Sequence, residues 1–136
     1  MKIIDNLCII DDDRICQFII KTYAKARSLA RNTQIFADAN SALDYLKSFS
    51  DDVNHLPDLI MLDINMPIMD GWSFLDEFQK ISPWINKEIP IFLITSSIQE
   101  EDKIKARQYS AVSGFYIKPI NEELIMNIFN RLPNLS

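Results

Sequence analysis

Polar side chains that could take part in phosphoryl or metal chemistry follow four of the five short apolar runs of this chain. They are Asp11, Asp12 and Asp13 after the first run, Asp63 after the third, Thr95, Ser96 and Ser97 after the fourth, and Lys118 and Pro119 after the fifth. Carboxylates without a Cys and His cluster suit Mg²⁺, which prefers hard oxygen ligands. An ammonium offsets part of the remaining charge and donates to a carboxylate or phosphoryl oxygen. A carboxylate beside a divalent cation, a lysine and a hydroxyl is arranged to accept a phosphoryl group, because positioning and charge neutralisation supply most of the catalysis.

These residues act together only if the fold brings the ends of separate runs to one place. The apolar runs are 7–10, 33–36, 59–62, 89–94 and 114–117. Their continuous apolar character is typical of strands that are buried on both faces of a parallel sheet. Helix-like segments alternate with them, so the sequence predicts an α/β fold: a (βα)5 open sheet with helices on both faces and right-handed connections. Such sheets bind ligands at the carboxyl ends of their strands.

The helical segments carry apolar stripes that we expect to pack on the sheet. The first stripe consists of Ile15, Phe18, Ile19, Thr22, Tyr23 and Ala26; the later ones consist of Leu43 and Leu46, of Phe74, Leu75 and Phe78, and of Leu124, Ile125, Ile128 and Phe129. Asp13 is predicted to cap the first helix. Gly71 and Gly114 are the only glycines, and we expect a turn with positive φ at Gly71 and a close approach of neighbouring atoms at Gly114.

Composition restricts the class of protein. A chain of 136 residues with 48% hydrophobic residues suffices for one packed core, so residues 1–136 are predicted to form a single domain. A net charge of -5 argues against binding to nucleic acid or to an anionic membrane. The sequence shows no signal peptide and no membrane span, so a cytoplasmic location is predicted. Cys8 and Cys16 are predicted to be reduced core thiols, and His55, the only histidine, a solvated loop residue.

Several motifs resemble those of response-regulator receiver domains of two-component systems, and the resemblance spans essentially the whole chain. Ile9-Ile10-Asp11-Asp12-Asp13 resembles the acidic motif after the first strand, and residues 57–71, PDLIMLDINMPIMDG, resemble the phosphoacceptor segment. Thr95 and Lys118-Pro119 follow in family order. The resemblance implies a flavodoxin-like fold with five parallel strands in the order 2-1-3-4-5. It also implies a single receiver domain over 1–136 without an output domain, similar to the chemotaxis-type regulators.

By position, the resemblance implies that Asp63 is the phosphoacceptor, which receives a phosphoryl group from a phosphohistidine on a histidine kinase or histidine phosphotransfer protein. The implied ligands of Mg²⁺, or of Mn²⁺, are Asp12, Asp63 and the backbone carbonyl of Asn65 directly, and Asp11 through a water. The implied phosphoryl-contacting residues are Lys118, Thr95 and Ser96. In the family, the residues at the positions of Asn65 and Ser97 flank the path of the attacking water and influence dephosphorylation. We expect the short, uncharged side chains of this chain to leave that path open.

The resemblance also implies a switch formed by Thr95 and Phe115. The Thr95 hydroxyl would turn toward the phosphoryl group, and Phe115, three residues before Lys118, would follow it inward. Tyr116 alternates to the other side of the strand and cannot substitute for Phe115. The surface of the fourth helix, fifth strand and fifth helix would then bind an unidentified downstream protein, as a monomer or as a phosphorylation-dependent dimer. In this family, histidine-containing partners dock on the first helix. The five basic residues between 14 and 32 are therefore either a solvated face or a surface that steers an acidic partner.

Other functions stay open at this point. The domain could be a relay intermediate that passes phosphate to a histidine phosphotransfer protein. An Mg²⁺-dependent phosphohydrolase with an aspartyl phosphate intermediate is a further alternative, although such enzymes use a second Asp where this chain has Asn65. A flavodoxin-like binding domain, or a scaffold that works without phosphorylation, is the non-catalytic alternative.

Overall fold

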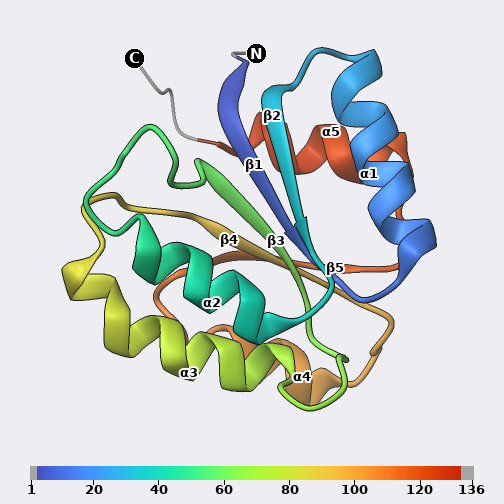
Figure 1. The fold of residues 1–136 in the computed structure, drawn as a ribbon. Helices are drawn as coiled ribbons and strands as arrows, with labels where there is room; N and C mark the ends of the chain where they lie inside the picture. The colour runs from blue at the N-terminus through green and yellow to red at the C-terminus, as the bar shows by residue number, and fades with distance from the viewer. Residues whose placement is uncertain (1–2, 133–136) are drawn as a thin grey trace.

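The computed structural model describes residues 3–132 and shows five strands that alternate with five α-helices (Figure 1). The strands are β1 (Ile4–Ile10), β2 (Ala30–Phe36), β3 (Leu59–Asp63), β4 (Ile91–Thr95) and β5 (Val112–Ile117). The helices are α1 (Arg14–Ala26), α2 (Ala39–Ser48), α3 (Gly71–Ile81), α4 (Glu100–Ala106) and α5 (Glu122–Asn130), with a short 3₁₀ turn, η1 (Ser82–Trp84), after α3. The strands pair in parallel in the order β2-β1-β3-β4-β5, which confirms the predicted fold.

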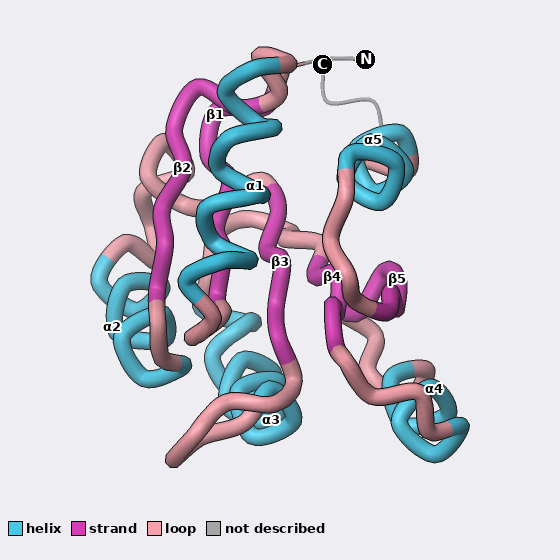
Figure 2. The backbone as a smooth tube through the Cα atoms, turned by 90° about the vertical axis from the view of Figure 1, so that its right-hand side faces the viewer, coloured by secondary structure: helices cyan, strands magenta, loops and turns pink. Residues whose placement is uncertain are grey.

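The helices cover both faces of the sheet and form two cores. Side chains of α1 and α5 pack on one face, and side chains of α2, α3 and α4 pack on the other. Figure 2 shows this separation most plainly at β4 and β5, which lie between α5 above and α4 below. Every residue of β3 and β4 is buried, as continuous apolar runs predict for central strands. β4 begins later than predicted, because Pro90 lies before it.

The buried face of α1 differs from the predicted stripe. Cys16, Ile20 and Ala24 are its buried residues, whereas Ile15 is 70% exposed and Phe18 is 69% exposed. Thr22 and Ala26 are exposed as well. The prediction is confirmed for Ile19 and Tyr23, which pack against this core, and was wrong for the other four residues. It followed the larger side chains, although the small Cys16 and Ala24, at i and i+8, mark the stripe that faces the sheet. The prediction for Asp13 is confirmed: its Oδ1 accepts from the amide of Ile15 (2.9 Å) and caps α1.

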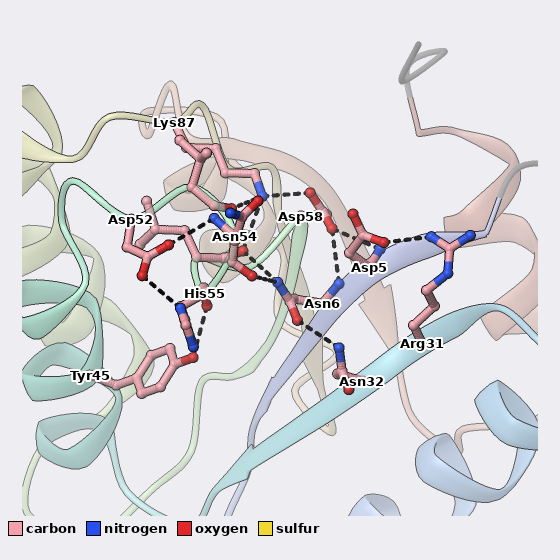
Figure 3. Close-up of polar contacts among 12 residues, drawn as sticks. Asp5, Asn6, Arg31, Asn32, Tyr45, Asp52, Asn54, His55, Asp58 and Lys87 are labelled. Atoms are coloured by element: carbon pink, nitrogen blue, oxygen red, sulfur yellow. Dashed lines mark hydrogen bonds and ion pairs between the residues drawn. The ribbon is translucent and has the colours of Figure 1, made fainter.

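A polar network at the amino end of the sheet joins β1 to the start of β3 (Figure 3). Asp58, directly before β3, accepts from the amides of Asp5 (3.0 Å) and Asn6 (2.9 Å) and pairs with Lys87 (2.6 Å). Asn6 Nδ2 donates to the carbonyl oxygen of Leu56 (3.2 Å) in the loop that leads to β3. These contacts fix the register of β1 against β3, and the register decides which residues meet at the far, carboxyl end of both strands.

Three further sequence predictions have clear outcomes. Cys8 and Cys16 are free and buried, as predicted. His55 is an exposed loop residue, as predicted, with its ring beside the Asp52 carboxylate (2.7 Å) and stacked on Phe49. Within residues 3–132, no helix is long and apolar enough to cross a membrane.

Both glycines are required by close approach of other atoms. A Cβ on Gly114 would lie 2.8 Å from Cδ1 of Phe92, which confirms the prediction there. The prediction of a positive φ at Gly71 was wrong. A Cβ on Gly71 would instead lie 2.7 Å from the carbonyl oxygen of Asp63 and 2.8 Å from Cα of Ile64. Gly71 therefore lets the start of α3 pack directly against the backbone at the end of β3.

Gly71→Ala is expected to lower the free energy of unfolding by about 1–3 kcal/mol, because the added methyl group meets backbone atoms that cannot move aside independently. Urea unfolding measures the change. Ser73→Ala, at an exposed position of the same helix, is the matched control and should stay close to the wild-type value. A Gly71→Ala protein as stable as this control would contradict the close-packing explanation.

Candidate functional site

The sequence-predicted site residues converge where the loops after β1, β3 and β4 gather, at the lower right of Figure 1. Ile10 of β1 pairs with Leu62 of β3, so the next residues, Asp11 and Asp63, emerge side by side. Thr95 ends β4 and pairs with Ile117, the last residue of β5, directly before Lys118. Four parallel strands thus deliver their polar residues to one edge of the sheet, as the alternation of runs predicts.

Three carboxylates and one ammonium form the centre of the site. Asp11, Asp12 and Asp63 each offer a carboxylate oxygen, and these oxygens lie within 4.8 Å of one another. Asp11 and Asp63 are only 3% and 4% exposed, whereas Asp12 is exposed to solvent. Nζ of Lys118 lies 3.2 Å from Oδ2 of Asp11 and 3.6 Å from Oδ2 of Asp63. One lysine therefore faces a cluster with three negative charges when all the acids are ionised.

This crowding shifts the protonation equilibria of the site. Burial, and then the charge of Asp11, raise the pKa of Asp63 to about 6. Burial also raises the pKa of Asp11. Burial disfavours the charged form of Lys118, but Asp11 and Asp63 outweigh that effect and raise its pKa. The ammonium therefore stays charged at neutral pH, and the carboxylates remain short of compensating positive charge.

The donor set fits a divalent cation. The three clustered side chains supply hard oxygen atoms, which suit Mg²⁺ or Mn²⁺. With Lys118 alone, three carboxylates and one ammonium leave an excess of two negative charges (3 − 1), which a divalent cation would cancel. One acid is solvent-exposed and two are buried, so a cation held there could keep some of its waters.

Thr95 supplies a buried hydroxyl on the other side of Asp63. Its Oγ1 accepts from the amide of Ser97 (3.1 Å) and from Nδ2 of Asn65 (3.3 Å). The amide of Asn65 in turn donates to Oδ1 of Asp63 (3.3 Å). Both contacts of Thr95 occupy lone pairs, so its hydroxyl hydrogen stays available for an incoming oxygen. Ser96 lies beside Thr95 and is exposed.

The segment after β5 is tied to the end of β4. The amide of Lys118 donates to the carbonyl oxygen of Thr95 (2.8 Å), and the Lys118–Pro119 peptide bond is cis. Phe115 is half-buried and packs with the core under α2, α3 and α4. Tyr116 packs on the opposite face with α1 and α5, where its ring lies 6.1 Å from that of Phe92. The predicted alternation of these two aromatic residues is confirmed, and their switch role stays a prediction.

Two contacts of the site escaped the sequence analysis. Nε2 of Gln17 donates to the carbonyl oxygen of Asp11 (2.6 Å) and supports the loop after β1. Gln17 lies one helical turn after the capping residue Asp13, and this spacing could have indicated that its side chain reaches back to the loop after β1. The hydroxyl of Ser97 donates to Oδ2 of Asp102 in α4. That pair spans the junction of a loop and a helix, where neither the helical nor the strand period applies.

Comparisons with known proteins agree with this geometry. The family model of the response regulator receiver domain matches residues 7–130. Chemotaxis protein CheY of Bacillus subtilis is 26% identical over 130 residues, which cover 95% of this chain and 98% of that protein. A solved two-component response regulator from Cytophaga hutchinsonii is 27% identical, with a TM-score of 0.86, and the match covers 98% of this chain and 100% of that one.

Some relatives are much longer than this chain. Protein-glutamate methylesterase/protein-glutamine glutaminase 2 of Pseudomonas aeruginosa is 31% identical over 116 residues, which cover 84% of this chain and 30% of that protein. The chain spans still smaller shares of two other curated relatives. The likeness is thus to one domain of those proteins and does not extend to their other activities. Because the family model covers nearly all of the described residues, the chain belongs to the family of response regulator receiver domains.

Proposed function

We propose that this receiver domain is a phosphoacceptor in a two-component or phosphorelay pathway, and that Asp63 receives the phosphoryl group from a phosphohistidine of a partner protein. The observation that carries the proposal is the convergence of Asp11, Asp12, Asp63 and Lys118 at one edge of the sheet. Asp63 suits the acceptor role because it ends the central strand β3 and has both another carboxylate and an ammonium beside it.

In the proposed step, a carboxylate oxygen of Asp63 attacks phosphorus and forms an O–P bond. The P–N bond to the imidazole breaks, and its electron pair returns to the ring nitrogen, which takes up a proton. Lys118 would stabilise the charge on a phosphoryl oxygen, and Thr95 would donate its free hydroxyl hydrogen to another. Ser96 is placed beside them as a further contact. Bound at Asp12, Asp63 and the Asn65 carbonyl, and at Asp11 through water, Mg²⁺ or Mn²⁺ would supply positive charge that offsets the phosphoryl oxygens.

Phosphorylation would signal through the surface formed by α4, β5 and α5. It replaces the single charge of Asp63 by a group with more charge and more acceptor oxygens, which require donors. Movement of Thr95 toward that group would vacate space for Phe115, which lies one strand away and packs beside the same core. A downstream protein that binds the rearranged surface better would favour this state. Asn65 and Ser97 would influence the lifetime of the acyl phosphate.

Exposure of the wild-type protein to acetyl phosphate tests the proposal. We expect a phosphorylated species in intact-mass spectra when Mg²⁺ or Mn²⁺ is present, and no such species when EDTA replaces the cation throughout the incubation. A protein that acquires no phosphate with either cation would refute the proposal. Continuous release of phosphate from external phosphoesters would instead favour the phosphohydrolase alternative.

The outer face of α1 has the properties of a docking surface for the phosphohistidine partner. Ile15 and Phe18 are exposed there, on the turns next to the acidic cluster. Of the five basic residues, Arg27 pairs with Glu122 and Arg31 pairs with Asp5 (2.5 Å). Among the described residues, no acid pairs with the exposed side chains of Arg14, Lys21 and Lys25. An apolar pair flanked by free cations fits a partner with an acidic rim.

Combined replacement of Phe18 and Lys21 by Ala is expected to slow phosphotransfer from a histidine-phosphorylated donor protein by about three- to tenfold, because an apolar anchor and a steering charge are lost together. Phosphorylation by acetyl phosphate should not change, since this small donor needs no docking surface. Lys47→Ala serves as the control, because Lys47 is exposed on α2, which covers the opposite face of the sheet from α1. Equal slowing with both donors would show that the α1 changes disturb the site itself.

A further inference from the structure

A continuous series of hydrogen bonds leads from Asp63 to α4. The amide of Asn65 donates to the Asp63 carboxylate, and Nδ2 of Asn65 donates to Oγ1 of Thr95. The amide of Ser97 donates to the same Oγ1, and the hydroxyl of Ser97 donates to Oδ2 of Asp102. The Thr95 hydroxyl, whose hydrogen the proposed phosphoryl group needs, is thus linked through its acceptor oxygen and Ser97 to a carboxylate in the first turn of α4.

The core holds α4 less firmly than the other helices. Only Ala106 among its seven residues is buried, and Ile104 is half-exposed. Its cap, Gln99, makes no side-chain hydrogen bond to the first turn. Figure 2 shows α4 at the margin of the molecule, joined to β4 by the loop that contains Ser97. At this end of the helix, the contact between Ser97 and Asp102 is therefore a main restraint.

The other end of α4 is held by contacts to α3. The Tyr109 hydroxyl donates to Oδ1 of Asp76 (2.8 Å), and the Tyr109 ring stacks on Trp72 with 5.8 Å between ring centroids. Nζ of Lys105 lies 4.8 Å from the centroid of the Trp72 ring. With its far end anchored in this way, α4 would respond to loss of the Ser97 contact mainly at its first turn and in the preceding loop.

We infer that Asp102 is a positioning residue that holds Ser97, and through it the Thr95 hydroxyl, in a resting arrangement that phosphorylation of Asp63 must break. This inference rests on the proposed phosphoacceptor function. Its physical basis is competition: Thr95 must move to reach a phosphoryl oxygen, and the amide of Ser97 can keep its bond to Oγ1 of the moving Thr95 only if the Ser97 hydroxyl leaves Asp102. The free energy of this hydrogen bond therefore opposes activation.

Binding of beryllofluoride in the presence of saturating Mg²⁺ tests the inference, because this probe mimics the phosphoryl group on a carboxylate. Ser97→Ala and Asp102→Ala are each expected to tighten the apparent Kd by about three- to tenfold, the effect of one net hydrogen bond. The double variant should gain no more than either single variant, because both remove the same contact. Titrations followed by fluorine NMR give these constants.

Glu101→Ala is the matched control, since it removes one exposed acid from the same turn of α4 and leaves Ser97 paired. If the role of Asp102 were purely structural, Asp102→Ala would lower the stability of the protein without lowering the Kd for beryllofluoride. Hydrogen exchange supplies a second readout: the amides of residues 97–106 should exchange faster in unliganded Asp102→Ala than in Glu101→Ala. An Asp102→Ala protein with the Kd of the control, or with weaker binding, would overturn the inference. A wild-type protein that fails to bind the probe would instead refute the phosphoacceptor function and the inference with it.

Discussion

Asp63→Asn is expected to abolish acyl phosphate formation, with a loss of about three orders of magnitude or more in the rate of phosphorylation. The amide has nearly the size of the carboxylate and can stay near Lys118, but its oxygen and nitrogen are poor nucleophiles toward phosphorus. The effect should appear with acetyl phosphate as well as with a phosphohistidine donor, because the change removes the attacking atom and leaves docking on α1 intact.

Intact-mass spectrometry after exposure to acetyl phosphate and Mg²⁺ measures this loss, and peptide mapping locates any residual phosphate. Asp13→Asn is a suitable control, because Asp13 lies beside the acidic cluster, caps α1, and can be replaced by Asn, which is an equally good cap residue. The control should be phosphorylated at the wild-type rate. Phosphate on the Asp63→Asn protein at a neighbouring acid would mean that the acceptor has been assigned to the wrong residue.

The site was predictable because the fold converts positions in the sequence into positions in space. Each apolar run ends where its strand ends, and parallel strands end at one edge, so Asp11, Asp63, Thr95 and Lys118 had to meet once the runs were read as strands. The order of the strands did not follow from the apolar pattern, which is equally compatible with other orders. It came from the resemblance of the motifs and is confirmed by the observed pairing.

The predictions that were wrong or missing have a common physical cause. They concern which side chains come into contact, whereas the order of the helices and strands along the chain was predicted correctly. The apolar pattern of α1 allows two faces, and only the sheet decides that Cys16, Ile20 and Ala24 are buried. Gly71 is required by backbone atoms of the residues at the end of β3, which lie close only after folding. The contact between Ser97 and Asp102 likewise depends on how the loop after β4 meets α4. None of these distances is encoded in a local period.

The raised pKa of Asp63 makes stability depend on pH when no divalent cation is present. Asp63 ionises with a pKa of about 6 in the folded protein, against an ordinary value of 3.8. Between these values the folded state binds more protons than the unfolded state, so the contribution of Asp63 to the free energy of unfolding falls as the pH rises from about 4 to about 6. The loss amounts to roughly 2–3 kcal/mol, since one pKa unit corresponds to about 1.4 kcal/mol.

Asp13 and Asp52 act in the opposite direction, so the prediction concerns a difference between two proteins. The pKa values of Asp13 and Asp52 are lowered, mainly by hydrogen bonds from Cys16 and His55, and their contributions to stability rise with pH. Subtraction of the wild-type free energy of unfolding from that of Asp63→Asn, measured in EDTA by urea unfolding, removes these shared terms. The free energy of unfolding of Asp63→Asn, relative to that of the wild type, should increase by roughly 2–3 kcal/mol as the pH rises from 4 to 7.

Addition of Mg²⁺ at pH 7 then separates two causes of this gain. If repulsion and burial of ionised carboxylates destabilise the wild type, a cation that binds the folded site should stabilise it by mass action, and should stabilise Asp63→Asn less because one ligand has lost its charge. The advantage of the variant would shrink as Mg²⁺ is raised. Stability curves that run parallel from pH 4 to 7 in EDTA would contradict the raised pKa, whereas a gap that persists in saturating Mg²⁺ would show that Asn stabilises the site by better packing or hydrogen bonding. The acidic cluster would then lower the stability of the folded protein when no cation is bound. The same cluster would favour the folded state in which a divalent cation is bound, because the cation removes the repulsion among the carboxylates.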